Sequence, residues 1–356
     1  MSPANPHQHP AWFGAVMGTG VLGVALSSLA AAFDIEAGWL QGVAGVFVLL
    51  ASLLAVVLAP RYVQRLLPGG RQRLQQELRD PAAGALLATA PGGLLVLAAA
   101  WPRVLGDWLG DPAFAVGAVL VAAGAVLAVL LGLAWAYAIA DAHEPRLHHV
   151  NGGWFVPPAV NVLVPLAIAP YLARVGEGWR SELFGVGLLF WGAGTLLFLV
   201  VLPLLVARIA LQPMAPPATA PSHFIPLAPA GIAGAAAISL VAAAEQVGLV
   251  EAAVVSGAAI VATALAGFGL WYSVLALMFL RRARKDGAAP FHPGWWGFVF
   301  PLGAMAVGLA LLSQAWDSMS MAWLGLAYAA AGLLAWAVVA ANSLRLFLQE
   351  PPSEHR

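Results

Sequence analysis

The chain has 356 residues, of which 62% are hydrophobic and only 9% are charged, and it contains no cysteine. A soluble domain carries roughly 25% charged residues, so this composition excludes a soluble protein and indicates one that lies in a lipid bilayer. Sixteen basic residues balance sixteen acidic ones, which argues against nucleic acid as a partner. Without cysteine, disulfides, thiolate metal sites and cysteine nucleophiles are excluded.

Ten long apolar segments follow one another along the chain. A helix needs about 20 apolar residues to cross a bilayer, whereas a membrane β-barrel shows alternating segments of about ten residues. We therefore expect an all-α integral membrane protein. The predicted spans are residues 11–33, 39–59, 82–101, 113–140, 154–172, 183–210, 224–244, 250–280, 295–315 and 321–348. The connections are too short for a separate domain, so residues 1–356 are expected to form a single transmembrane domain.

Lysine and arginine are distributed unevenly between the two sides of this topology. Thirteen lie on the side of the two termini, and three, Arg103, Arg174 and Arg180, lie on the other. Loops rich in these residues stay in the cytoplasm, so we expect both termini to be cytoplasmic, in a bacterial inner membrane. With the acidic residues included, the cytoplasmic side carries +6 and the outer side −6. Such a field would gather cytoplasmic anions, although topology alone also explains much of the asymmetry.

The odd-numbered spans begin alike. Phe13, Phe155, Phe224 and Trp296 occupy corresponding positions, at multiples of about 71 residues. A fixed period of this kind indicates a tandem repeat, here five helical hairpins.

Glycine or proline recurs just inside the start of each odd span, and the predicted kink positions are Gly18, Pro91, Pro158, Pro229 and Pro301. Proline in a membrane helix leaves a carbonyl unpaired, which is tolerated only against protein or a water-filled cavity. We therefore expect five kinked odd spans to line a central pore, with five straighter even spans behind them. Close packing through small residues is the alternative explanation for each single position.

The interiors of the predicted spans contain no clearly buried Asp, Glu, Lys or Arg. A proton-coupled pump normally needs such residues, and an acidic ring that would select cations is also missing. The odd spans begin on the cytoplasmic side, so the positive ends of their helix dipoles face that mouth. These features favour small anions as the transported species.

All eight histidines lie on the cytoplasmic side, and His9, His223 and His292 immediately precede odd spans. One hypothesis is that their protonation near pH 6 adds positive charge to a cytoplasmic vestibule and raises anion flux. The alternative is that they are solvated residues at helix starts. We predict no cofactor and no metal site, because no ligand spacing in the chain is specific for one.

Three stretches resemble one known family. Residues 9–20 (HPAWFGAVMGTG), 154–161 (WFVPPAVN) and 295–301 (WWGFVFP) resemble the first, fifth and ninth helices of the tellurite-resistance/dicarboxylate transporter family. That family includes bacterial tellurite-resistance proteins, fungal malate and sulfite transporters and the plant guard-cell slow anion channel. The resemblance covers essentially the whole chain. It implies five tandem hairpins around a pore, usually in a homotrimer with one pore per subunit, and an occluding phenylalanine that corresponds to Phe300.

The residues and the resemblance together predict a gated channel for chloride-like or nitrate-like anions, with a neutral pore that Phe300 occludes. The alternative is a transporter of C4-dicarboxylates such as malate, or of sulfite, coupled to protons or to the membrane potential. The scarcity of intramembrane charge favours the channel, because a dianion in hydrocarbon needs a countercharge. An enzyme is not expected, since the chain has no HExxH, GxSxG or phosphate-binding glycine loop.

Overall fold

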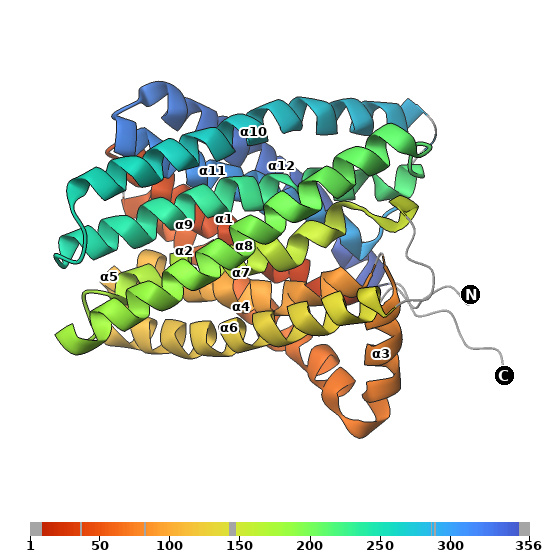
Figure 1. The fold of residues 1–356 in the computed structure, drawn as a ribbon, viewed down its shortest axis with the longest axis horizontal. Helices are drawn as coiled ribbons and strands as arrows, with labels where there is room; N and C mark the ends of the chain where they lie inside the picture. Colours follow the sequence, from red (N-terminus) through yellow and green to blue (C-terminus); the bar gives the residue numbers. More distant parts are fainter. Residues whose placement is uncertain are drawn as a thin grey trace.

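The computed structural model describes residues 9–35, 38–81, 83–141, 147–285, 287 and 290–348. These residues form helices and connecting loops without any β-strand. Ten of the helical segments in this part of the chain are long and apolar enough to cross a membrane. The all-α membrane class and the number of spans predicted from the sequence are therefore confirmed (Figure 1).

Each odd-numbered span begins with a short 3-10 turn that leads into an α-helix. The five pairs are η2 (Pro10–Phe13) and α1 (Gly14–Ala32), η4 (Gly84–Ala88) and α4 (Thr89–Ala100), η7 (Gly152–Phe155) and α7 (Val156–Ile168), η9 (Pro217–Phe224) and α9 (Leu227–Gln246), and η10 (Pro293–Trp295) and α11 (Trp296–Trp316). The five odd spans thus share one local structure at their starts, as tandem repeats do.

The even-numbered spans are single long α-helices: α2 (Gly38–Leu66), α6 (Asp111–Ala140), α8 (Glu177–Leu211), α10 (Ala252–Lys285) and α12 (Met319–Leu348). A polar helix that the sequence analysis did not predict, α3 (Arg71–Arg79), stands beside α2 and α6 and protrudes from the bundle in Figure 1. The third span is longer than predicted, because it continues from α4 through a π-helical turn, η5 (Trp101–Leu105), into α5 (Gly106–Leu109).

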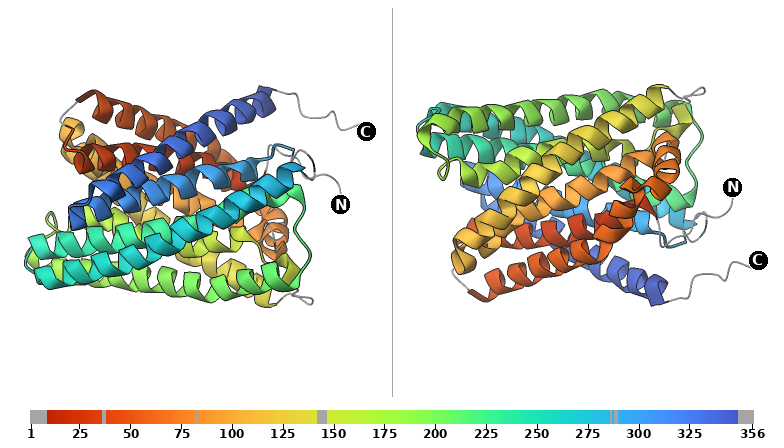
Figure 2. Two further views of the ribbon diagram at one scale, coloured as in Figure 1. Left: turned by 90° about the horizontal axis from the view of Figure 1, so that it is seen from above. Right: turned by 90° about the horizontal axis from the view of Figure 1, so that it is seen from below.

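The odd and even spans form an inner and an outer layer. In the most apolar part of each span, 78–94% of the residues of the odd spans are buried, against 17–33% for the even spans. Each inner helix packs on the outer helix that follows it: α1 on α2, α4 on α6, α7 on α8, α9 on α10 and α11 on α12. The inner helices also contact one another in the order α1, α4, α7, α9, α11 and back to α1, which closes a ring. Five tandem hairpins therefore surround one axis, and their helices run lengthwise through the molecule in both views of Figure 2.

The inner spans all begin at the same end of the bundle, which we call the proximal end, and run toward the opposite, distal end. The Trp12 ring lies 4.5 Å from the ring of Phe347. The start of the first span therefore adjoins the end of the last, so the described chain begins and ends at the proximal end (Figure 1).

Three of the predicted kink prolines lie in the first turn of an α-helix and not in its interior. Pro91, Pro158 and Pro229 are each the third residue of their α-helix, in α4, α7 and α9. The first-turn amides of an α-helix have no partner within the helix, so proline costs little there. These residues mark the change from a 3-10 turn to an α-helix within each span. Pro301, by contrast, lies inside α11.

Candidate functional site

A narrow cavity lies inside the ring of inner spans, and we call it the central cavity. Its volume is about 40 Å³, enough for no more than a few water molecules. All five inner spans line it, through Ala11, Gly14, Met17, Leu86, Thr89, Val156, Ala159, Ile225, Ala228, Pro293, Gly294, Trp296, Gly297, Phe300 and Pro301. It is the place where the five repeats meet.

Phe300 lines the central cavity from α11, and its side chain is only 6% exposed. Most of the other lining residues are small or aliphatic, and two carry polar side-chain atoms. The Thr89 hydroxyl donates to the Pro10 and Leu86 carbonyls, at 3.1 and 2.7 Å. The Trp296 indole N–H is buried without a hydrogen-bond partner among the described residues. The lining of the central cavity is therefore almost entirely apolar.

A wider cavity of about 490 Å³, the proximal vestibule, adjoins the central cavity on its proximal side. The two cavities are neighbours because Leu86, Ile225 and Gly294 line both. The vestibule lining contains five histidines, His9, His148, His149, His223 and His292, together with the charged residues Asp80 and Arg208. The structure thus brings together the three histidines that the sequence analysis singled out.

Two of these histidines cap the starts of inner spans. Nδ1 of His9 accepts a hydrogen bond of 3.1 Å from the Ala11 amide. Nδ1 of His292 accepts one of 3.1 Å from the Gly294 amide, while its Nε2 lies 2.9 Å from the Ala218 carbonyl. A ring nitrogen accepts a hydrogen bond only when it carries no proton, so both caps need the neutral imidazole.

Burial above all, and then the neighbouring His292 at 6.3 Å between ring centroids, lower the pKa of His9 from 6.5 to about 4. Arg65 acts in the same direction, while Glu77 and Asp80 oppose the shift without cancelling it. This shift argues against the hypothesis that His9 becomes protonated near pH 6.

Gly18 lies at a contact between helices. A methyl group there would be 3.0 Å from Cβ of Val299 and 3.1 Å from Cε3 of Trp296, so the glycine lets α1 approach α11 closely. It is absent from the described lining of the central cavity, as are Pro91, Pro158 and Pro229. Residues close to three of these positions, among them Thr89, Ala159 and Ala228, line it instead. Composition alone does not identify these lining residues, since most of them are small apolar residues of a kind found throughout the spans.

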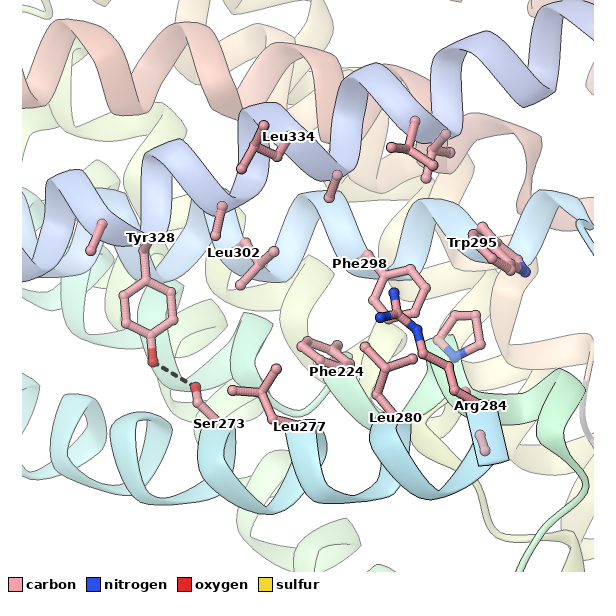
Figure 3. A pocket seen from close by; sticks show the side chains of 18 residues that line it. Phe224, Ser273, Leu277, Leu280, Arg284, Trp295, Phe298, Leu302, Tyr328 and Leu334 are labelled. Carbon is pink, nitrogen blue, oxygen red and sulfur yellow. Dashed lines mark hydrogen bonds between the residues drawn. The ribbon is translucent and has the colours of Figure 1, made fainter. Parts of the chain in front are cut away.

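A further cavity of about 660 Å³, the lateral groove, lies outside the ring between α10, α11 and α12 (Figure 3). Apolar side chains such as Phe298, Leu302 and Leu334 line most of it. Its polar groups include the Ser273 and Tyr328 hydroxyls, which lie 2.5 Å apart. None of its lining residues comes from α1, α4 or α7, and none of them lines the central cavity, so the two cavities are separate.

The third span contains a charged side chain that the sequence analysis placed in an outer loop. Arg103 belongs to the π-helical turn η5, within the span Gly84–Leu109. The expectation of neutral span interiors is therefore wrong at this position. The helix extends past Pro102 because the π-helical turn accommodates an extra residue, a feature that hydropathy does not detect.

Comparison with known proteins identifies the family. The profile of the family described as "voltage-dependent anion channel" matches residues 7–344. An uncharacterized transporter of Methanocaldococcus jannaschii is 30% identical over 299 residues, which cover 83% of this chain and 80% of that protein. A sulfite efflux pump of Arthroderma otae is 25% identical over 354 residues, covering 93% and 88%. These relatives are transporters, not enzymes. The resemblance seen in the sequence motifs is thereby confirmed, and the chain belongs to the voltage-dependent anion channel family.

Proposed function

We propose that this protein is a gated channel through which small inorganic anions pass along the axis of the inner ring, and that Phe300 is its gate. One observation carries the proposal: Phe300 projects into a cavity bounded by all five inner spans. Because that cavity holds no more than a few water molecules, an anion passes only if the phenyl ring of Phe300 moves aside. Pro301 follows directly and lies inside α11, where the loss of a backbone hydrogen bond makes local movement easier.

The proximal vestibule supports a preference for anions without supplying a strong binding site. All five inner spans begin there, so their first amide groups and the positive ends of their dipoles point toward it. Its two charged lining residues, Asp80 and Arg208, have opposite signs. We therefore propose that His9, His223 and His292 shape the vestibule, and that the helix ends attract the anion.

A coupled transporter of sulfite is the second candidate, and the relatives named as sulfite efflux pumps favour it. A C4-dicarboxylate such as malate remains the organic alternative. Both substrates are larger or more highly charged than chloride, and a dianion inside the membrane needs countercharge. The described central cavity lining has no charged residue, which favours a small monovalent anion.

Two further features belong to this proposal. We infer from the excess of lysine and arginine that the proximal end faces the cytoplasm. We also expect a homotrimer in which each subunit conducts separately, and the ring that closes within one chain supports a passage of its own for each subunit.

Purified protein reconstituted in liposomes tests the proposal, with chloride, nitrate, sulfite and malate compared as the only permeant anion. A channel gives anion currents that follow the membrane potential and persist without a pH gradient. Flux that appears only with a pH gradient, and is largest for sulfite or malate, contradicts the channel and supports the coupled transporter.

A further inference from the structure

Arg103 lies in the distal part of the protein, where its charge has no counter-ion. Its Nη1 atom is buried and has no hydrogen-bond partner among the residues that the structure describes. No carboxylate of the described chain forms an ion pair with it either, although Arg65, Arg174 and Arg180 all have acidic partners. A cation without a carboxylate partner is costly in a membrane-spanning segment, and such residues usually serve a function.

The Arg103 side chain extends toward a helix that is not its neighbour in the ring. Its Nη2 atom lies 3.4 Å from the Ser239 hydroxyl of α9. In the ring, α7 separates α4 from α9 on one side, and α1 and α11 separate them on the other. A contact between the third and seventh spans therefore crosses the inside of the ring.

Ser239 lies on the side of α9 that faces the passage. It follows Ala228, which lines the central cavity, by 11 residues, so the two side chains differ in direction by only about 20°. The helical rise over this distance is roughly 16 Å toward the distal end. Ser28 stands in the same relation to Met17 on α1, and its hydroxyl is buried without a partner in the described structure.

We propose that Arg103 forms a binding site for a small inorganic anion on the distal side of the gate. The guanidinium would donate a charge-assisted hydrogen bond through Nη1, and the Ser239 and Ser28 hydroxyls stand on passage-facing sides of two other inner spans. The site deepens the proposed function and rests on it, because the anion reaches Arg103 along the same passage. Because the Arg103 guanidinium is the one positive charge of the proposed site, the anion binds weakly enough to leave again, as conduction requires.

Anion binding can be measured without transport, through the unfolding temperature of the purified protein in detergent. Chloride, nitrate or sulfite replaces gluconate at constant ionic strength. A bound anion raises the unfolding temperature of the native protein. We expect R103Q to lose this rise and R103K, which keeps the charge but not the planar fork, to retain part of it. In gluconate, R103Q should be at least as stable as the wild type, because an unpaired buried charge has been removed.

Arg174 provides the matched control. It lies on the same side of the topology but is 43% exposed and pairs with Asp111 at 2.8 Å. R174Q should therefore keep the full anion-dependent rise. A rise of equal size in R103Q and in the wild type overturns the proposed site, and so does the absence of any anion-dependent rise in the wild type.

Liposome currents separate failure of this site from failure of the channel itself. We expect the F300A/R103Q double variant to need a severalfold higher chloride concentration for half-maximal current than F300A alone. An unchanged half-maximal concentration overturns the site and leaves the channel standing. If neither the wild type nor F300A carries anion current, the proposed function fails, and the unfolding measurements still decide whether Arg103 binds anions.

Discussion

Phe298 and Phe300 lie two residues apart on α11 and face different compartments. Phe300 lines the central cavity, whereas Phe298 lines the lateral groove outside the ring. Two residues correspond to about 200° around an α-helix, which explains the opposite directions. The Phe298 ring packs at 4.9 Å from Phe224 and 5.7 Å from Trp295, while none of the described aromatic rings stacks on Phe300. Phe298 thus packs against other aromatic rings, whereas Phe300 lines the central cavity.

The His9 cap should make the fold sensitive to acid without making transport sensitive to it. The pKa of His9 is about 4 in the folded protein and 6.5 without the shift. The unfolded chain therefore binds the proton more readily, so stability is complete above pH 6.5 and falls as the pH drops toward 4. At pH 4.5 we expect a loss on the order of 2 kcal/mol from this residue. Thermal unfolding in detergent at pH 7.5 and 4.5 measures it.

The variant H9N provides the control for this prediction. Asparagine caps an inner span in the same manner at Asn151, whose Oδ1 accepts a 2.7 Å hydrogen bond from the Gly153 amide, and it does not titrate. H9N should match the wild type at pH 7.5 and lose less stability at pH 4.5. Anion flux through F300A should be unchanged by H9N between pH 5.5 and 8. If H9N and the wild type lose equal stability between pH 7.5 and 4.5, His9 is not the cause of the acid sensitivity.

Removal of the Glu77 carboxylate should destabilise the proximal end. Glu77 accepts hydrogen bonds from Nε of Arg65 at 2.7 Å and from Nε of Arg73 at 2.9 Å. Arg65 is only 5% exposed, so E77Q leaves a buried charge without its carboxylate, and we expect a loss of about 3 kcal/mol. Asp111 pairs with the more exposed Arg174, so D111N should cost less than about 1 kcal/mol. Equal losses in chemical unfolding would contradict this ranking.

Close packing of α9 on α11 should not tolerate even one added methyl group. A Cβ at Gly231 would lie 2.5 Å from the Ala304 carbonyl oxygen and 2.6 Å from the Met305 amide nitrogen. Both are backbone atoms, so G231A must separate two helices of the ring, at a cost of about 1–3 kcal/mol. In α8, a Cβ at Gly192 meets nothing within 4 Å, and G192A should be neutral or stabilising. Unfolding temperatures in detergent compare the two variants, and a stable G231A would argue against this contact.

Hydropathy and the repeat were sufficient to predict ten spans and their division into hairpins. Each span is long and apolar, and the entries around Phe13, Phe155 and Trp296 recur at a regular distance. The layers could be inferred because glycine and proline gather in the odd spans, which are the buried ones. The sequence does not show where in a helix a proline acts, so Pro91, Pro158 and Pro229 were expected inside spans whose α-helices begin only two residues before them.

Other features of the candidate site depend on three-dimensional contacts. Arg103 was assigned to a loop because the apolar run ends at Trp101, just before this charge, whereas the π-helical turn continues the helix through Arg103. The pKa of His9 depends on burial and on His292, a residue 283 positions later in the chain. Gly18 was predicted to be a kink position in the pore lining, but it lies at a contact with α11. A sequence does not distinguish a glycine at a kink from one at a contact between helices.

The current through F300A in liposomes, compared with the wild type and with F298A, tests the central claim most directly. Both variants remove a buried phenyl ring from α11, but only F300A removes one that lines the central cavity. The account predicts that F300A raises chloride conductance severalfold at the same amount of reconstituted protein, while F298A stays near the wild-type value or falls through loss of stability. Conductance of F300A at the wild-type level, or an equal increase in F298A, would contradict the claim that Phe300 closes the passage.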